Sequence, residues 1–392
     1  MNRILFLITS ILFAYSAPLH AENEEKRPFV SLLTCSPAEE VYELFGHTAL
    51  RYCNPQKGYD IVFNYGVFDF NEPGFVSKFV SGETDYMLVA IDYPFFIQEY
   101  ELRGSQVTEQ VLAFDSVQME RFIAKLRMNC HPANRIYRYN YFYNNCTTKA
   151  RDIIETSLGN GEKIKYNHSQ EQTTFREEVH RFTHVSPWYK FGIDLLLGYK
   201  ADITQESRTL QFIPSTLMKD IATATIVTDS DSLKPLMAEE NILSEEIYAD
   251  DKATILFTPE LAFALLLILT LTATYIERKK KITFWGIDLC LLTTQGMAGV
   301  LITYMVFCSS HPTVDSNMLL ILLNPLPLLI LPIYIYNVVK HRKQQIMWLQ
   351  AATSALFLAV GPFLPQDFPT PIYMFATTQL IRSLSIITQK QK

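Results

Sequence analysis

The sequence predicts an exported α+β domain followed by an all-α membrane domain. Residues 1–21 have a basic start at Arg3, an apolar run and a small residue before a cleavage site, which is typical of a signal peptide. Residues 22–250 alternate strand-like and helix-like patterns, and residues 251–392 are mostly apolar. A net charge of −6 argues against a surface that binds nucleic acid.

Alternating apolar residues between turn signals predict strands in the first half of the exported domain, at 29–35, 47–52, 59–70, 86–91 and 107–114. The Asn-Pro-Gln-Lys-Gly turn at 54–58 predicts that the second and third of these strands form a hairpin. A helix is expected at 116–129, because Phe122, Ile123 and Leu126 share one face. Residues 225–246 predict a helical or loop approach to the membrane.

The stretch 139–152 contains the candidate nucleophile, Cys146. Its first part, with Tyr139, Tyr141 and Tyr143 alternating, predicts an extended strand, and the part from Thr147 predicts a helix. A thiol at a helix start faces unpaired N–H groups and the positive end of the helix dipole, and both favour the thiolate. Cys146 could instead form a disulfide, since three other cysteines lie in the exported part.

A cysteine nucleophile needs a base, and His47 is the strongest candidate. It follows Gly46, which allows a tight approach, and it opens a predicted strand. In the predicted hairpin Asn64 comes near His47, where its side chain could orient the imidazole, although it could equally be an ordinary strand residue. The pattern therefore indicates a Cys–His hydrolase or transferase.

Five apolar segments are long enough to span a bilayer, roughly 254–276, 283–307, 317–337, 345–362 and 370–388. Lysine and arginine follow the first, third and fifth segments, whereas the loops 308–316 and 363–369 contain neither. The positive-inside rule therefore places the basic stretches and the C-terminus in the cytoplasm. The N-terminal domain and the two uncharged loops are then expected outside.

Some polar residues of the membrane part are candidates for a site. His311 and Asn317 lie at or just inside the expected outer surface, where polar side chains tend to line a cavity. Arg382 lies well inside the fifth segment. It would either extend toward the cytoplasm or bind a lipid headgroup, and the sequence leaves both interpretations open.

Three ordered motifs resemble one known family. They are Phe-Gly-His-Thr-Ala at 45–49, Phe-Asn-Tyr-Gly-Val-Phe-Asp-Phe at 63–70, and Asn-Asn-Cys-Thr-Thr with Arg-Asp at 144–152. The family is Lnb, the lipoprotein N-acyltransferases of Bacteroides-type bacteria, formerly a domain of unknown function. The resemblance covers essentially the whole mature chain, including Pro187-Trp188 and the segment 311–325.

The resemblance implies a papain-like thiol fold in the periplasm and a multi-pass domain in the bacterial inner membrane. The histidine precedes the cysteine, which is similar to the circularly permuted branch of NlpC/P60-type folds and to lecithin–retinol acyltransferases. The roles carried over are Cys146 as nucleophile and His47 as base, with Asn64 as third member by position. The implied partners are membrane glycerophospholipids and diacylglyceryl lipoproteins. No metal or cofactor is implied, and the histidines do not cluster at ligand spacing.

Six further residues are candidates for substrate binding, three beside the nucleophile and three in the membrane part: Tyr143, Asn145, Arg151, His311, Asn317 and Arg382.

Two other functions fit the same residues. The Cys–His pair could serve a hydrolase that acts on peptidoglycan or peptides, although such an enzyme would rarely need five membrane spans. The chain could also be a non-enzymatic, membrane-anchored binding module with an unreactive Cys146. Activity without residues 251–392 would favour the hydrolase, and function with Cys146→Ser would favour the binding module.

Overall fold

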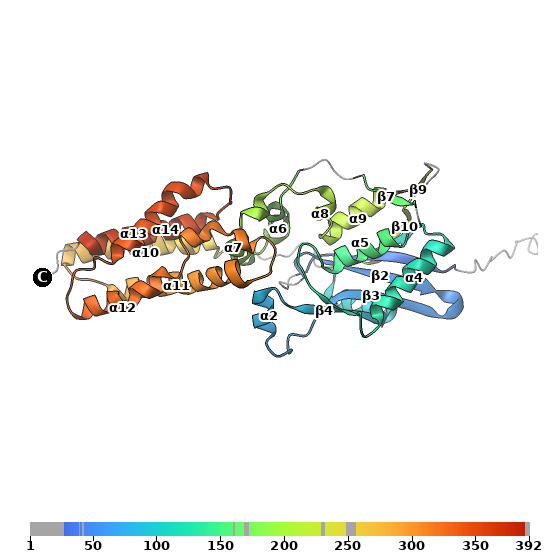
Figure 1. Ribbon diagram of the computed structural model, residues 1–392, viewed down its shortest axis with the longest axis horizontal. Coiled ribbons are helices and arrows are strands. Elements are labelled where there is room, and N and C mark those ends of the chain that lie inside the picture. Colours follow the sequence, from blue (N-terminus) through green and yellow to red (C-terminus); the bar gives the residue numbers. More distant parts are fainter. Residues whose placement is uncertain are drawn as a thin grey trace, which may run out of the picture.

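The computed structural model describes residues 27–38, 40, 43–159, 161–167, 172–228, 232–247 and 256–388. The expected signal peptide at 1–21 and the expected domain boundary near residue 250 lie outside these ranges. Figure 1 shows an elongated molecule with a sheet and its helices at one end and a bundle of long helices at the other.

A seven-stranded antiparallel sheet organises the N-terminal domain, in the order β10-β5-β1-β2-β3-β4-β6. Its strands have the following bounds: β1 Phe29–Cys35, β2 His47–Asn54, β3 Tyr59–Val67, β4 Asp85–Asp92, β5 Val107–Leu112, β6 Ile136–Arg138 and β10 Met237–Ser244. The first five agree with the strands that the sequence predicts. The expected hairpin is present, because β2 pairs with β3 across a short 3-10 turn at Pro55–Lys57.

Helices cover both faces of this sheet, namely α3 Tyr93–Arg103 on one and α4 Ser116–Cys130, α5 Cys146–Thr156 and α9 Pro214–Thr223 on the other. The domain also contains α2 Phe75–Ser81, α6 Phe175–Thr183, α7 Pro187–Leu196 and α8 Ser207–Leu210. Leu32 and Leu50 face the side covered by α4, α5 and α9, whereas Leu33 and Ala49 face α3. Because both faces are covered, β1 and β2 are almost continuously buried, including polar residues such as Thr48 and Arg51.

Two local predictions are wrong. Residues 139–145 form a tight turn with one bridge between Asn140 and Asn144, not a strand. Residues 225–227, 233–235 and 237–244 form strands, not a helix or loop. Two of these, β8 Thr225–Val227 and β9 Leu233–Pro235, join β7 Lys163–Lys165 in a small second sheet, while β10 extends the main sheet beside β5.

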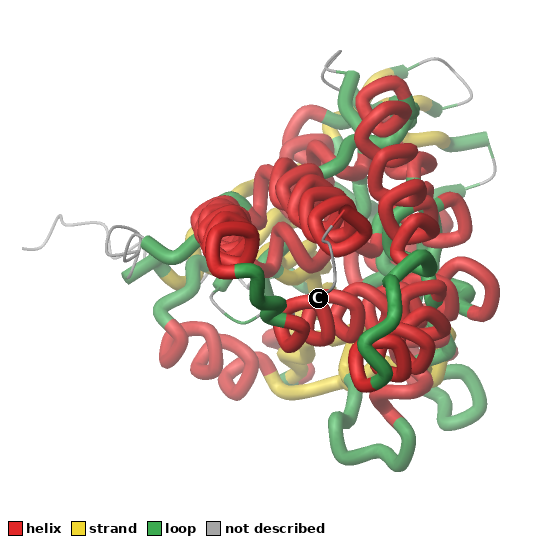
Figure 2. Tube along the Cα trace, turned by 90° about the vertical axis from the view of Figure 1, so that its left-hand side faces the viewer, coloured by secondary structure: helices red, strands yellow, loops and turns green. Residues whose placement is uncertain are grey.

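The C-terminal part is a helical membrane domain that contains α10 Pro259–Lys280, α11 Trp285–Cys308, α12 Leu326–Val339, α13 Met347–Val360 and α14 Thr370–Thr388. Within the described ranges, three segments are long and apolar enough to cross a membrane, namely Pro259–Lys280, Trp285–Cys308 and Met318–Val339. The segment Met347–Phe363 is apolar but shorter. Figure 2 views this bundle from the end at which the C-terminus lies.

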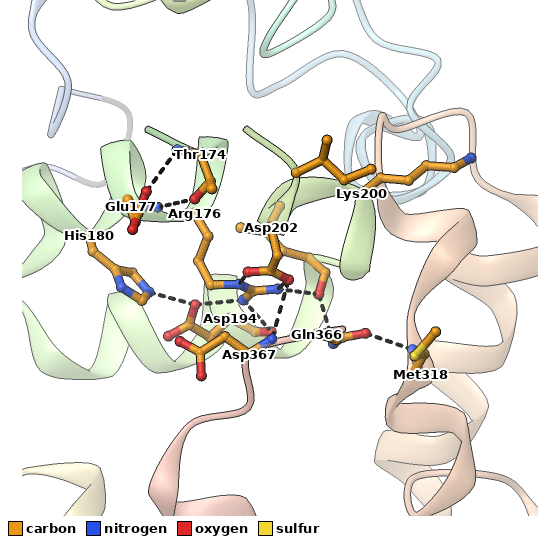
Figure 3. A network of polar contacts seen from close by, with 12 residues as sticks. Thr174, Arg176, Glu177, His180, Asp194, Lys200, Asp202, Met318, Gln366 and Asp367 are labelled. Carbon is orange, nitrogen blue, oxygen red and sulfur yellow. Dashed lines mark hydrogen bonds and ion pairs between the residues drawn. The ribbon is translucent and has the colours of Figure 1, made fainter. Parts of the chain in front are cut away.

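The two domains meet through α6, α7 and the outer loops of the bundle. Arg176, which is 2% exposed, donates from Nε to Asp202 at 2.6 Å and from Nη1 to Asp194 at 2.8 Å. Asp202 also accepts the backbone N–H of Asp367, which lies in the loop before α14 (Figure 3). Apolar residues of α7, including Phe191, pack against the ends of the bundle helices. These contacts attach the sheet domain to the bundle.

Candidate active site

The two main candidate residues each begin a secondary-structure element. His47 is the first residue of β2, and Cys146 is the first residue of α5. The hydroxyls of their neighbours Thr48 and Thr147 lie 3.1 Å apart and are fully buried. This contact fixes the register of the helix start against the strand start, and therefore of the thiol against the imidazole.

The cap of α5 holds Cys146 in place. The Asn145 side chain accepts the backbone N–H of Thr148 at 2.9 Å, and the Thr148 hydroxyl accepts the N–H of Asn145 at 2.8 Å. This reciprocal pair is a capping box. The Asn145 amide also donates to the carbonyls of Tyr141 and Phe212, at 3.0 and 2.8 Å. The residue before the nucleophile is therefore anchored on both sides.

Asn64 on β3 contacts His47, as the hairpin predicts. Its Oδ1 lies 2.6 Å from Nε2 of His47, and the same ring is close enough to the Cys146 thiol for each group to shift the pKa of the other. Because Nε2 is hydrogen-bonded to Asn64, the other ring nitrogen, Nδ1, is the one available to the thiol. The order of contacts is thus thiol, imidazole, amide, and this is the geometry of an activated thiol.

The electrostatics of the pair favour an ionised thiol. Burial alone would raise the pKa of Cys146, but the charge and hydrogen bond of His47 and hydrogen bonds from Thr48 and Thr147 lower it to about 7. Burial alone would lower the pKa of His47, yet Cys146 and Asn64 together raise it above 6.5. Both side chains are only partly buried, and the thiol is free rather than in a disulfide. Near neutral pH the pair therefore populates thiolate and imidazolium.

Sequence inspection missed Tyr137 on β6. Its hydroxyl is buried, and no hydrogen-bond partner for it is present among the described residues. A methyl group on Gly66 would lie 3.6 Å from Cys146 Cβ and 4.0 Å from the Tyr137 hydroxyl, so both border the space that the glycine leaves open. Gly66 has a φ of 92°, at an irregularity in the pairing of β3 with β4. The buried hydroxyl without a partner is the feature that marks Tyr137 as a candidate. It can be recognised only in the tertiary structure, not in the sequence.

Family models match most of the chain. One, described as the Lnb N-terminal periplasmic domain, matches residues 18–179, and another, described as the Lnb transmembrane domain, matches residues 250–392. The chain belongs to the Lnb family. No curated protein and no solved structure matches it significantly. The candidate triad of this Lnb-family chain lies entirely within the part that the periplasmic-domain model matches.

The other candidates near the nucleophile differ in accessibility. Tyr143 lies on the turn before the cap and is 54% exposed, so it is available to a substrate. Asn145 is occupied by its capping bonds. Arg151 is buried and donates to the Asp152 carboxylate and to the carbonyl of Arg208, which indicates that it packs α5 against the chain near α8.

The membrane-part candidates contact different parts of the chain. Nε2 of His311 lies 2.6 Å from the carbonyl oxygen of Phe79 on α2. Asn317 donates to the carbonyls of Leu195 and Leu196 at the end of α7, so it joins the two domains. Within the described chain, no three histidine, cysteine, aspartate or glutamate side chains gather as a metal site would require.

Arg382 is buried in a charge cluster between membrane helices. Its side chain is 1% exposed and lies between Glu277 of α10 and Asp288 of α11. Its five N–H groups donate to these carboxylates and to the Thr274 hydroxyl. A guanidinium saturated in this way has no donor left for a lipid phosphate. The two carboxylates offset the cost of burying the guanidinium, which accounts for its inward orientation.

Proposed function

We propose that this protein is a lipoprotein N-acyltransferase that moves an acyl chain from a membrane glycerophospholipid, through a thioester on Cys146, to the α-amino group of a diacylglyceryl-cysteine lipoprotein. The observation that carries the proposal is the contact sequence Cys146, His47, Asn64 in a domain docked onto membrane helices. Both substrates are lipid-anchored, so an enzyme for them must work beside the bilayer.

In the first step the Cys146 thiolate attacks the carbonyl carbon of the phospholipid ester. The new S–C bond forms as the ester C–O bond breaks, and His47 gives its proton to the departing glycerol oxygen. A lysophospholipid leaves. The carbonyl oxygen carries negative charge in the transition state, and its donors are the backbone N–H at the start of α5 and the Tyr137 hydroxyl. Burial raises the pKa of Tyr137 well above 10, so this hydroxyl keeps its proton.

In the second step the free α-amino group attacks the thioester carbonyl. The C–N bond forms, the C–S bond breaks, and His47 takes the amine proton, which restores the starting ion pair. An amine resolves a thioester readily, whereas water must be kept out for the acyl group to survive. The amide of Asn64 orients the imidazole in both steps, which is a positioning role.

The same proposal includes the fold of the N-terminal domain and the membrane topology. The order of histidine before cysteine, on a strand and a helix start, supports a circularly permuted papain-like domain. We place this domain in the periplasm, with a five-span domain in the inner membrane and the C-terminus in the cytoplasm. The outer loop residues Ser310 and Asp367 contact the N-terminal domain, which supports their location on the periplasmic side.

A mass spectrum of a lipoprotein's N-terminal lipopeptide tests the proposal. The host lacks its own N-acyltransferase and expresses the intact protein, the Cys146→Ala variant, or Cys130→Ala as a matched control thiol from the same domain. We expect an added acyl chain with the intact protein and with Cys130→Ala only. Acylation by Cys146→Ala would show that the nucleophile is wrong. If none of the three proteins acylates the lipopeptide, the result would favour a peptide hydrolase or a non-enzymatic binding module.

A further inference from the structure

The helix α2 is short, amphipathic and set apart from the sheet. It follows β3 and lies next to the outer end of α11 (Figure 1). Its apolar side chains are not covered, since Val76 is 74% exposed and Phe79 is 48% exposed. Phe70, in the loop that leads to the helix, is 61% exposed. A cluster of such residues on a soluble surface marks a contact with a partner or a membrane.

Hydrogen bonds attach α2 to the end of a membrane helix. The hydroxyls of Ser81 and Tyr304 lie 2.7 Å apart, and Tyr304 belongs to the last turns of α11. The backbone N–H of Ser310 donates to the carbonyl of Ser81 at 2.8 Å. Gly82, with a φ of 71°, ends α2 where a Cβ would lie only 2.7 Å from the backbone nitrogen of His311. These contacts hold α2 at the level where α11 leaves the bilayer.

The exposed face of α2 continues a lipid-facing surface. Along α11 the exposed side chains are apolar and follow one another toward α2: Met297, Val300, Leu301, Tyr304 and Phe307. Phe307, in the last turn, is 75% exposed. Hydrocarbon covers these side chains in the membrane. Because α2 is bonded to the same end of α11, the lipid of the outer leaflet is the partner that its apolar residues meet.

A row of stacked rings, here called the aromatic ladder, leads away from α2: Phe79, Phe75, Phe68, Tyr86 and Tyr139. Successive ring centroids are 6.2, 5.6, 4.7 and 4.1 Å apart, so no gap interrupts the row. Rings at such distances form a continuous apolar surface.

The ladder ends at the candidate active site. Phe68 follows Gly66 by two residues, and Gly66 is the residue whose missing side chain leaves space against Cys146 Cβ. Two residues of extended chain span about 7 Å. Tyr139 is the last ring of the ladder, at the end remote from α2, and the charge of Cys146 contributes to raising its pKa. One apolar surface therefore connects the outer leaflet with the nucleophile.

We propose that α2 inserts into the outer leaflet and that the aromatic ladder guides an acyl chain of the phospholipid donor from there to Cys146. The first half concerns membrane contact and stands by itself, whereas the second rests on the proposed function. The apolar groups of α2 supply the affinity for hydrocarbon. The rings of the ladder give a long flexible chain a row of mainly apolar groups to follow.

Photocrosslinking tests the membrane contact. The full chain is placed in nanodiscs of phosphatidylethanolamine and phosphatidylglycerol that contain a trace of phosphatidylethanolamine with a diazirine on one acyl chain. After irradiation, peptides are mapped by mass spectrometry. We expect the α2 peptide to carry at least about tenfold more lipid than the α4 peptide. The helix α4 is a matched reference, because Val117 and Met128 are 54% and 57% exposed on it and it lies far from the bundle (Figure 1).

Labelling of α2 no greater than that of α4 would overturn the insertion, and so would a dimer in which a second copy covers α2. The guiding role is tested with Val76→Ser/Phe79→Ser, matched by Val117→Ser/Met128→Ser on α4. We expect the α2 pair to lower acyl transfer about tenfold and to leave alkylation of Cys146 unchanged. Unchanged transfer by the α2 pair would overturn the guiding role. If α2 of the wild-type protein is labelled but the protein transfers no acyl chain, the proposed function is refuted and the membrane contact stands.

Discussion

Replacing His47 with alanine should move the ionisation of Cys146. In the intact protein the imidazole is the main reason that the pKa of the thiol is about 7 instead of 9.0. Without it, burial remains and raises the pKa to 9 or above. The midpoint of the pH dependence of Cys146 alkylation therefore moves upward by about 2 pH units, which corresponds to about 2.7 kcal/mol of lost stabilisation of the thiolate.

The rates at one pH are less informative than the midpoint. At pH 7 a pKa of 7 gives about fifty times more thiolate than a pKa of 9. A less basic thiolate is also a weaker nucleophile, here by about eightfold. The two effects leave about a sixfold faster reaction for the intact protein at pH 7, and at high pH the His47→Ala variant should react faster. This crossing of the two profiles is specific to a thiolate stabilised by its neighbour.

The assay is iodoacetamide labelling of the detergent-solubilised protein from pH 5 to 10, read at the Cys146 peptide by mass spectrometry. Cys130 is an internal reference, since burial raises its pKa and it lies away from His47. His131→Ala removes an exposed histidine and is the matched control variant. A wild-type midpoint near 9, or one that His47→Ala does not move, would refute the ion pair.

Four further outcomes are expected. Asn64→Ala removes the acceptor at His47 Nε2 and should lower kcat of acyl transfer about 10- to 100-fold, while Asn64→Asp retains more of it; equal loss in both would contradict an orienting role. Tyr137→Phe removes one donor to the carbonyl oxygen and should lower kcat about 10- to 100-fold with KM unchanged, measured by steady-state kinetics. Arg176→Met removes the guanidinium that Asp194 and Asp202 share at the domain junction and should cost about 3–5 kcal/mol, seen as a lower Tm in detergent. Arg382→Met should destabilise the bundle similarly, and neutralising Glu277 and Asp288 in addition should restore the Tm; no recovery would argue against the charge cluster.

The elements around the candidate triad could be predicted because their signals are local. Turn residues at 54–58 set the hairpin that brings Asn64 to His47, and the change from aromatic to helix-forming residues marks the start of α5 at Cys146. Local signals fail when a partner distant in sequence decides the structure. The residues of β10 are rich in acidic and polar side chains, and they form a strand because the edge of β5 offers them hydrogen bonds.

The turn at 139–145 shows a second kind of failure. Alternating tyrosines predict a strand, but Asn140, Asn144 and Asn145 compete for the backbone and close the chain into a turn. Arg382 shows a third kind. Its partners Glu277 and Asp288 belong to two other helices, so no spacing in the sequence indicates that the guanidinium is already saturated.

That charge cluster also constrains how the protein is made. Ribosomes deliver α10 and α11 first, so Glu277 and Asp288 reach the bilayer while Arg382 is still unsynthesised. A single carboxylate in a membrane helix costs about 2.5–3.5 kcal/mol on insertion scales. Until α14 is inserted, both carboxylates lack the arginine that neutralises them in the folded bundle. A chain that ends before α14 would therefore keep two carboxylates in its membrane helices without a cationic partner.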